Sequence, residues 1–467
     1  MTDQAPIQAP ASAVTEVISR LEAQFGDRLS KTAAIRERFG KDESFHASVP
    51  PDAVVTPKST EEVSQIVKLC AEHQVPVIPY GTGTALEGHV AALHGGISIN
   101  MQEMNDVIEV HDEDLDVVVQ PGVTRKQLNR YLHDRGLFFP IDPGADASLG
   151  GMTACRASGT NAVRYGTMRE NVLALTVVLA DGRVIKTSRR ARKSAAGYDL
   201  TRLFVGSEGT LGVITEITLR LYGIPEAISS AVCTFPDLDS AVATVITTIQ
   251  YGVPVARIEL LDEAQIDAIN RYSKTDLAVA PTLFLEFHGS DQAVKEQAQV
   301  VQELAADAGG SNFQWTTNTE ERNRLWQARH DAAYACKALR PDGEIWATDV
   351  CVPISQLAEC IRETQRDIKE SNLVAPIVGH VGDGNFHLVL LVDKDDPEEN
   401  ERAQQLHERM VMRALAMGGT CTGEHGIGYG KLDFLIAEHG EAVSVMRAIK
   451  QALDPDNIMN PGKILRV

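Results

Sequence analysis

Hydrophobic and polar positions along the first 225 residues alternate between helix-like and strand-like patterns. Residues 14–29 are predicted to form an amphipathic helix, because apolar side chains recur there every three or four positions. Ser59 and Glu62 have the spacing of a capping box at the start of a second helix. The apolar run 75–79 predicts a strand that leads directly into a loop rich in glycine and threonine.

Beyond Pro225 the pattern changes to strands and helices in pairs. The predicted strands 232–235 and 283–288 are each followed by a longer segment of helical periodicity. Such pairing is typical of an α+β domain, and we expect its sheet to be antiparallel. A further helix is predicted over residues 320–339, with Arg329 on the same stripe as Trp326 and Cys336.

Three loops of small residues interrupt the first half of the chain, at 80–88, 142–161 and 206–212. In the first loop Gly81 and Gly83 are not followed by a third glycine at 86, and no helical pattern comes next. This disfavours a dinucleotide-binding Rossmann unit. One such loop could be an ordinary turn, but three on separate strands indicate backbone that approaches a phosphate or a large flat ligand closely.

Length and charge limit the class of protein. With 467 residues the chain is too long for one ordinary core, and we expect two or three domains. The formal net charge of -20 argues against nucleic acid or an anionic membrane surface as a partner. The 7 cysteines include no CxxC pair, a pattern typical of a reducing compartment.

The first 13 residues show neither the basic and apolar regions of a secretion signal nor the Arg-rich helix of a transit peptide. Uninterrupted apolar runs are far shorter than the roughly 20 residues that span a bilayer. We therefore expect a soluble, cytoplasmic protein, with peripheral attachment to the inner membrane left open.

Candidate metal chemistry lies in the stretch 379–387, where two glycines and an Asp-Gly step predict a tight turn between apolar flanks. If residues 382–385 form the loop, His380 faces His387 with Cβ atoms about 4.5 to 5.5 Å apart. Two imidazoles at this distance from each other can bind one metal ion. A lone histidine in a chain with 13 is more commonly a surface or hydrogen-bonded core residue, so the pairing carries the prediction.

A second stretch, 418–428, displays Glu424 and His425 between glycines. Glycine leaves the backbone exposed and closely approachable, which suits Glu424 as a third metal ligand. His425 is suited to act as a general base beside it, because adjacent residues can point to different sides.

The small-residue loops resemble the FAD-binding domain of the vanillyl-alcohol-oxidase-like (PCMH-type) flavoproteins at 80–88, 142–165 and 205–215. The later stretches resemble the D-2-hydroxy-acid dehydrogenase branch of that family, at 379–387, 423–428 and 460–463. The motifs DPGADASLGGM, KSAAGYDLTRLFVGSEGTLG and GTCTGEHGIG are similar to the FAD-dependent D-lactate dehydrogenase (cytochrome) type. The resemblance runs from about residue 50 to the C-terminus.

The resemblance implies an α+β fold, in which a two-subdomain PCMH-type FAD-binding domain is joined to an α+β cap domain with an antiparallel sheet. The expected segments are an N-terminal helical arm (1–48), the FAD-binding domain (49–225), the substrate or cap domain (226–420) and a C-terminal segment that returns to the FAD domain (421–467).

Carried over position by position, the resemblance also assigns FAD-binding residues. The pyrophosphate would be held by Gly81, Thr82, Gly83 and Thr84. The flavin and ribityl chain would be lined by Pro143, Ser148, Gly151, Thr153, Ser158, Gly159 and Gly166, with Asn460 near the isoalloxazine. The adenosine side would meet Glu208, Gly209, Gly212 and Ile214. FAD is expected to be noncovalent, because Thr84 and Ala85 occupy the region where relatives with covalent flavin carry a histidine.

The resemblance gives the late motifs their roles. Arg329 would bind the substrate carboxylate, and His425 would take the hydroxyl proton. One divalent metal, Zn, Mn or Fe, would be held by His380, His387 and Glu424. The predicted reaction is oxidation of a small D-2-hydroxy acid, D-lactate favoured, with hydride transfer to flavin N5. Without the resemblance, Arg329 would be interpreted as a solvated salt bridge.

The expected partners are the 2-hydroxy acid and an external electron acceptor, which could be a cytochrome, a quinone or an electron-transfer flavoprotein. No nucleic acid is expected, and a homodimer is left open. One alternative is a glycolate oxidase catalytic subunit, and another is a D-2-hydroxyglutarate dehydrogenase, which Ala333 and Ala347 disfavour. A rival from a different class is a metal-dependent hydrolase, which leaves the three small-residue loops unexplained.

Overall fold

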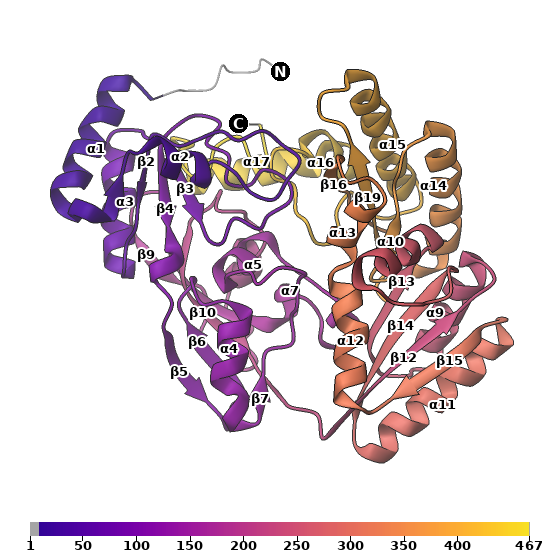
Figure 1. The fold of residues 1–467 in the computed structure, drawn as a ribbon. Helices are drawn as coiled ribbons and strands as arrows, with labels where there is room; N and C mark the ends of the chain where they lie inside the picture. Colours follow the sequence, from indigo (N-terminus) through magenta and orange to yellow (C-terminus); the bar gives the residue numbers. More distant parts are fainter. Residues whose placement is uncertain (1–8, 467) are drawn as a thin grey trace. The chain divides into compact units, whose positions relative to one another are not determined.

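The computed structural model describes residues 9–466, which form two compact units (Figure 1). Unit 1 contains the described residues up to Ala157, the segment Thr167–Gly223 and the chain from Glu424 onward. Unit 2 contains Ser158–Gly166 and Ile224–Gly423. Residues 1–8 of the expected N-terminal arm lie outside the described residues, and the four sequence-based segments stay a prediction.

Unit 1 is built on two main sheets. The four-stranded sheet has the order β1-β2-β4-β3, with β2, β4 and β3 parallel. Its strands are β1 (Leu29–Ser30), β2 (Ala53–Val55), β3 (Val77–Tyr80) and β4 (Ile97–Asn100). The five-stranded sheet is antiparallel and has the order β5-β6-β10-β8-β9. Its strands are β5 (Val107–His111), β6 (Asp116–Val119), β8 (Val172–Val178), β9 (Val184–Lys186) and β10 (Val213–Arg220), and β7 (Leu137–Phe138) pairs with β11 (Tyr222–Gly223).

The helices of unit 1 begin where the sequence offers caps. The side chain of Ser59 accepts a hydrogen bond from the amide of Glu62 at 3.2 Å, and Thr124 forms a full capping box with Gln127. Residues 149–155 are helical, although the sequence showed no clear pattern there, because Leu149 and Met152 bury one face in the core. The helices are α1 (Ala11–Phe25), α2 (Ala33–Phe39), α3 (Thr60–Glu72), α4 (Arg125–Leu132), α5 (Leu149–Cys155), α7 (Met168–Asn171) and α8 (Leu200–Phe204).

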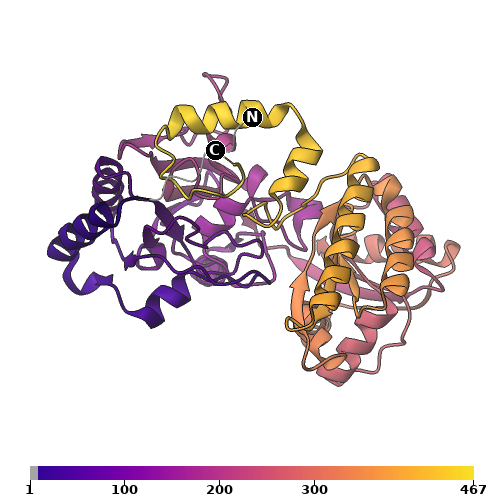
Figure 2. The same cartoon turned by 90° about the horizontal axis from the view of Figure 1, so that it is seen from above.

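The C-terminal segment completes unit 1. It forms α16 (Leu432–His439) and α17 (Ala442–Leu453), drawn in yellow in Figure 2. Beyond α17 the chain runs beside β3, where the amide of Val77 donates to Ile458 O and the amide of Asn460 donates to Val77 O, each at 2.8 Å. This pairing fixes Asn460 at the edge of the four-stranded sheet.

Unit 2 is organised by one eight-stranded sheet of order β15-β12-β14-β13-β18-β19-β16, with β17 paired to β19. Every pairing in it is antiparallel, so the predicted α+β unit with an antiparallel sheet is confirmed. The strands are β12 (Ala227–Thr234), β13 (Val255–Leu261), β14 (Thr282–Gly289), β15 (Ser311–Thr316), β16 (Glu344–Ala347), β17 (Val350–Cys351), β18 (Ile377–Gly379) and β19 (Asn385–Val392).

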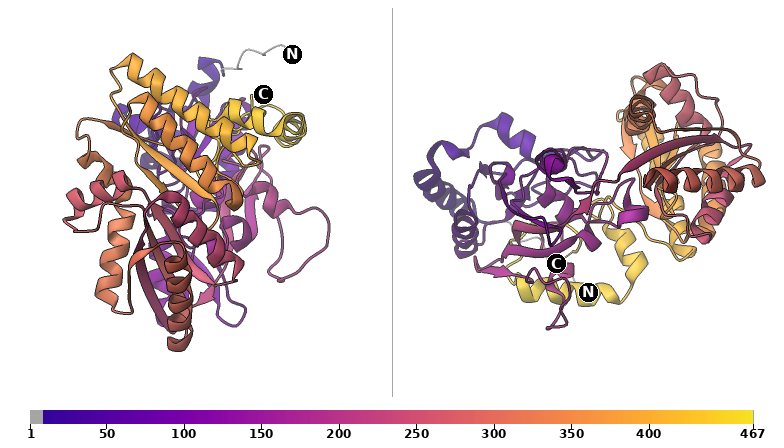
Figure 3. Two further views of the ribbon diagram at one scale, coloured as in Figure 1. Left: turned by 90° about the vertical axis from the view of Figure 1, so that its right-hand side faces the viewer. Right: turned by 90° about the horizontal axis from the view of Figure 1, so that it is seen from below.

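Helices cover the sheet of unit 2. The helices α10 (Glu263–Ser273), α12 (Thr319–His330) and α13 (Ala332–Ala335) share an apolar cluster with strand residues such as Leu261, Phe284 and Val378. A second group of helices packs in a row, with α14 and α15 side by side (Figure 2; Figure 3, left). This group contains α9 (Leu238–Gln250), α11 (Asp291–Asp307), α14 (Leu357–Ser371) and α15 (Pro397–Ala416), and a short helix α6 (Ala162–Tyr165) packs on β13.

Two local expectations for unit 2 are wrong. The helix expected over residues 320–339 breaks after His330, and Arg329 lies in its last turn. The turn between β18 and β19 also has another register, because His387 pairs with Val378 and not with His380. A shift by two residues keeps His380 and His387 on the same face, since side chains alternate with period two.

Gly384 in this turn has no room for a side chain. Its φ is +81°, and an added Cβ would lie 2.0 Å from Val352 O. Gly418 has a similar φ of +77°, but a Cβ there would meet open space. The close approach of backbone at Gly384 therefore fixes the turn that carries His380.

We predict that Gly418→Ala lowers the free energy of unfolding by about 1–2 kcal/mol, the strain of a left-handed backbone alone. Gly384→Ala should cost more than about 4 kcal/mol, because the backbone clash adds to that strain. Urea denaturation of both variants measures the difference. Equal losses would contradict the close approach at Gly384.

Candidate active site

The two predicted metal-binding histidines lie together in unit 2. The ring centroids of His380 and His387 are 5.5 Å apart, in an edge-on arrangement. A ring nitrogen of each comes within 4.8 Å of one on the other. His387 is buried on β19, and His380 follows the end of β18. Their convergence on one face of the sheet is compatible with joint binding of one ion.

The protein binds each of these rings through Nδ1. His380 Nδ1 lies 2.8 and 2.9 Å from the two carboxylate oxygens of Glu259. His387 Nδ1 lies 3.0 Å from the backbone oxygen of Thr348. With the proton on Nδ1, the lone pair of each ring is on Nε2, which is the tautomer that binds a metal through Nε2.

Glu259 also binds the predicted substrate arginine. Arg329 donates through Nε at 3.0 Å and through Nη2 at 2.5 Å to the same oxygen of Glu259. Burial would raise the pKa of Glu259, but the charges and hydrogen bonds of His380 and Arg329 outweigh it and hold the pKa below its usual range. Glu259 is therefore held as a carboxylate between the Arg329 guanidinium and the His380 imidazole.

A second buried carboxylate, Asp349, lies near His387. Its oxygens accept hydrogen bonds from Asn385 Nδ2 at 2.7 Å and from Thr422 Oγ1 at 2.6 Å. It is also 3.5 Å from His387 Nδ1. Asp349 thus ties the histidine strand to the loop that precedes Glu424.

The chain reaches Glu424 through a close contact in unit 2. A Cβ at Gly423 would lie 2.4 Å from Asn385 Nδ2, so only glycine passes there without displacing the amide. Glu424 is the next residue, and consecutive Cα atoms are about 3.8 Å apart. Unit 2 therefore ends in a close contact of Gly423 with Asn385, which lies two residues before His387 on β19.

In unit 1, Glu208 holds the turn that follows His425. Its carboxylate accepts hydrogen bonds from the amides of Ile427 at 2.7 Å and Gly428 at 2.8 Å. The family resemblance implies that Glu208 lies on the adenosine side of FAD. In the structure, the contacts of its carboxylate are with the protein. Glu208 is 6% exposed and also lies 3.3 Å from His89 Nε2.

A third carboxylate, Glu87, approaches His425. Glu87 Oε1 is 4.0 Å from His425 Nδ1 and 3.0 Å from Lys431 Nζ. Lys431 is completely buried, so its charge balances that of Glu87 in a region of low polarity. An imidazole beside such a carboxylate is supported when it takes up a proton.

The first predicted FAD loop lies against the second within unit 1. The amide of Ser148 donates to Thr82 Oγ1 at 3.3 Å, and a Cβ at Gly81 would lie 2.3 Å from Ser148 Oγ. The buried hydroxyls of Ser148 and Ser207 have no hydrogen-bond partner in the protein. Unsatisfied buried polar groups beside bare glycine backbone fit a bound cofactor that supplies the missing partners.

Other predicted FAD residues make identifiable protein contacts. Thr153 Oγ1 bonds to Leu149 O within α5 at 2.7 Å, and a Cβ at Gly212 would meet Val177 at 2.6 Å. Asn460 Nδ2 donates to the backbone oxygens of His89 and Glu208 at 3.1 and 2.8 Å. The remaining positions divide between unit 1 (Thr84, Gly83, Pro143, Gly151, Gly209 and Ile214) and unit 2 (Ser158, Gly159 and Gly166).

Burial by itself would lower the pKa of His89, but the Glu208 carboxylate and the Cys155 thiol outweigh it and hold that pKa well above its usual range. His89 therefore lies buried beside Glu208, in the part of unit 1 that carries the small-residue loops.

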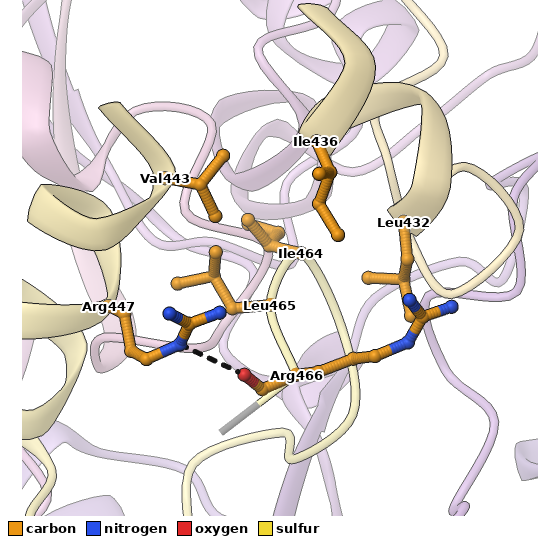
Figure 4. Close-up of a pocket in the computed structure, with 7 residues that line it drawn as sticks. All are labelled: Leu432, Ile436, Val443, Arg447, Ile464, Leu465 and Arg466. Carbon is orange, nitrogen blue, oxygen red and sulfur yellow. Dashed lines mark hydrogen bonds between the residues drawn. The ribbon is translucent and has the colours of Figure 1, made fainter. Parts of the chain in front are cut away.

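A small hollow at the C-terminal end of unit 1 is not a candidate substrate site (Figure 4). Its volume of about 10 Å³ accommodates roughly one water molecule. Apolar side chains of α16 and α17 line it together with the chain end, where Arg447 Nε donates to Arg466 O at 3.2 Å.

The sequence reasoning missed Glu259, Asp349, Glu87 and Ser207 as functional candidates. Glu259 gave one usable signal, because it is a lone carboxylate within the apolar strand 258–261. A charge at a buried strand position requires a cationic partner. Asp349 and Glu87 lie in irregular segments, where the sequence offers no periodicity to indicate burial.

Comparison with known families finds two matches in this chain. Residues 51–188 match a family described as "FAD binding domain", and residues 224–464 match "FAD linked oxidases, C-terminal domain". A Danio rerio protein named "Probable D-lactate dehydrogenase, mitochondrial" is 56% identical over 98% of this chain and 93% of its own length. An Arabidopsis thaliana protein named "D-lactate dehydrogenase [cytochrome], mitochondrial" is 50% identical over 96% of this chain and 80% of its own length.

Among solved structures, p-cresol methylhydroxylase with substrate bound superposes with a TM-score of 0.82. The match covers 98% of this chain and 97% of that one, at 18% sequence identity. It confirms the predicted fold of a PCMH-type flavoprotein.

The expected cytoplasmic location is wrong, because the Danio rerio and Arabidopsis thaliana relatives are named mitochondrial. Among the helices of residues 9–466, none combines the length and apolar character needed to cross a bilayer.

We predict that Glu208→Gln lowers the free energy of unfolding by about 1–3 kcal/mol, because the new amide group faces a buried backbone N–H instead of accepting from it. Urea denaturation measures the loss. Glu216→Gln on β10 is the matched control, since Glu216 is a partly exposed carboxylate bonded to Thr176 Oγ1 at 2.7 Å. Its cost should stay within about 0.5 kcal/mol. Equal costs for the two variants would contradict the anchoring role of Glu208.

Proposed function

The chain belongs to the FAD-linked oxidase family, and on that premise we propose that it oxidises a small D-2-hydroxy acid, D-lactate foremost, to the 2-oxo acid. It is an FAD-linked oxidoreductase. The observation that carries the proposed substrate chemistry is the buried carboxylate of Glu259, which joins Arg329 to His380. A metal-dependent hydrolase would leave both family matches unexplained.

Arg329 is the proposed binding group for the substrate carboxylate. A guanidinium has five N–H donors, and Glu259 accepts from two of its nitrogens, Nε and Nη2. The donors of Nη1 remain for a second carboxylate, and a charge-assisted hydrogen bond suits a 2-hydroxy acid anion. Arg329 also supplies the local positive charge that a chain of net charge -20 needs to attract an anion.

His380, His387 and Glu424 are the proposed ligands of one divalent ion, bound through Nε2 of both rings and the carboxylate. Support comes from the Nδ1 contacts of both histidines, which fix the required tautomer. Such an ion would lower the pKa of a bound hydroxyl, as it lowers the pKa of a bound water to about 7. Nitrogen and carboxylate ligands suit zinc, manganese or iron.

His425 is the proposed general base. It would accept the proton of the substrate hydroxyl, a contribution of about 10²- to 10⁴-fold to the rate. Glu87 at 4.0 Å would stabilise the imidazolium, while Lys431 Nζ lies 3.0 Å from Glu87 Oε1 and balances its charge. The C2 hydrogen would leave with its two electrons as hydride, so that the C2–O bond becomes a carbonyl. Bound FAD would supply the acceptor for that hydride.

We propose that FAD binds noncovalently between the loops at 80–88 and 148–151, where the Ser148 hydroxyl lacks a partner. The proposed electron acceptor is a cytochrome, as the Arabidopsis thaliana relative is named, with a quinone or electron-transfer flavoprotein as alternatives. A net charge of -20 favours an acceptor with a positively charged surface. A homodimer is a further proposal, which sedimentation of the purified protein tests.

We predict that His380→Ala abolishes D-lactate oxidation while the protein keeps its visible flavin absorbance, because only the metal site is lost. Turnover with a dye acceptor and the absorbance spectrum measure the two effects. His407→Ala is the matched control, since His407 is a buried histidine of unit 2 that packs edge-on against Trp346. It should keep activity. A His380→Ala protein with normal turnover would exclude the metal role.

Arg329→Met should lower kcat/KM for D-lactate about 10- to 100-fold through a raised KM and a lower kcat, because a charge-assisted hydrogen bond is lost. Arg329→Lys keeps the charge for Glu259 and should retain the fold. Steady-state kinetics of both variants check the prediction. Unaltered kinetics in Arg329→Met would remove Arg329 from the site.

A further inference from the structure

Glu259 is a completely buried charged group of unit 2. It lies on β13 and is 0% exposed. Both of its oxygens contact His380 Nδ1, at 2.8 and 2.9 Å, and one of them also accepts from Arg329 Nε at 3.0 Å. One carboxylate therefore contacts two side chains that have different proposed roles.

We propose that Glu259 is the positioning residue of the site, which sets the metal-binding nitrogen of His380 and the orientation of Arg329 together. The inference rests on the proposed function, because it assigns Glu259 to the same site. It adds a residue that contacts neither the ion nor the substrate and acts through the side chains that do.

The effect on His380 follows from its tautomer. A carboxylate that accepts the Nδ1–H keeps the proton on that nitrogen and leaves the lone pair on Nε2. It also increases the basicity of the ring as a ligand. Loss of such an outer-shell partner typically lowers metal affinity about 10- to 100-fold.

The effect on Arg329 follows from its last-turn position on α12. Glu259 accepts from Nε and Nη2, so the guanidinium plane is fixed. The donors of Nη1 are then the ones proposed to bind the substrate. A long side chain at a helix end would otherwise populate many rotamers. The same carboxylate thus reduces the entropy that substrate binding must overcome.

A neighbouring cluster in the same sheet shows which features are specific to Glu259. Glu286 on β14 also contacts a histidine and an arginine, His288 at 2.8 Å and Arg257 at 3.5 Å. There both ring nitrogens of His288 are used within unit 2, because Nδ1 lies 2.8 Å from Tyr165 Oη. Neither nitrogen of His288 is therefore available to a metal ion. The Glu286 cluster contains the same residue types as the Glu259 cluster, so it provides a matched control.

The test compares Glu259→Gln with Glu286→Gln. A glutamine at 259 lacks the negative charge, and its NH₂ group presents a donor to His380 or Arg329 in place of one accepting carboxylate oxygen. Zn²⁺ is titrated into each metal-free, FAD-loaded protein in competition with a chromophoric chelator, and KM for D-lactate is measured on the zinc-loaded forms. We expect Glu259→Gln to bind Zn²⁺ about 10- to 100-fold more weakly, with a raised KM. Glu286→Gln should match the wild type within about twofold.

The outcomes separate the inference from the function on which it rests. Wild-type protein that binds no Zn²⁺ would overturn the proposed metal site itself. Wild-type Zn²⁺ affinity in Glu259→Gln, or an equal loss in Glu286→Gln, would overturn the positioning role alone. Glu259→Asp keeps the charge with a shorter reach and should fall between wild type and Glu259→Gln. If Glu259→Gln does not fold, wild-type affinity and KM in Glu259→Asp would overturn the inference.

Discussion

The buried charge of Glu259 is the constraint on which the geometry of unit 2 depends. An isolated carboxylate removed from water costs several kcal/mol, so it persists only with a cationic partner and hydrogen-bond donors. Here the partners are Arg329 and His380. The helix α12 must therefore direct Arg329 at the sheet, and the β18–β19 turn must keep His380 on the same face. The groups proposed to bind substrate and metal are thus placed by charge compensation in the core.

The Glu424–His425 pair depends on anchors at both of its flanks. Before it, Thr422 bonds to the buried Asp349, and Gly423 passes Asn385 too closely for any side chain. After it, Glu208 accepts hydrogen bonds from two successive amides of the turn. Glycine-rich segments lose much entropy on folding, and these polar anchors offset that loss. The polar anchors therefore hold this glycine-rich segment in place, although its sequence alone would leave it flexible.

The sequence predicted what depends on local periodicity and on family motifs. The helix over residues 238–250, the antiparallel sheet and the FAD-linked family were all predicted correctly. The register of the pairing between β18 and β19 was not predicted correctly. It depends on the close approach of Gly384 to Val352, which lies in a distant part of the sequence. Glu259 was missed for the same reason, since its partner Arg329 is far away in the chain. The predicted cytoplasmic location was wrong, because that prediction relied on N-terminal sequence patterns alone. The individual site residues stay a prediction.

The central claim is that one ion binds through Nε2 of both histidines while Glu259 holds Nδ1 of His380. Anomalous X-ray diffraction from crystals of the zinc- and FAD-loaded protein, recorded at the zinc edge, tests it most directly. If the proposed metal site is correct, we expect one strong peak about 2.0 to 2.1 Å from Nε2 of His380 and of His387. A peak bound to Nδ1 of either ring, or a peak away from both histidines, would contradict it.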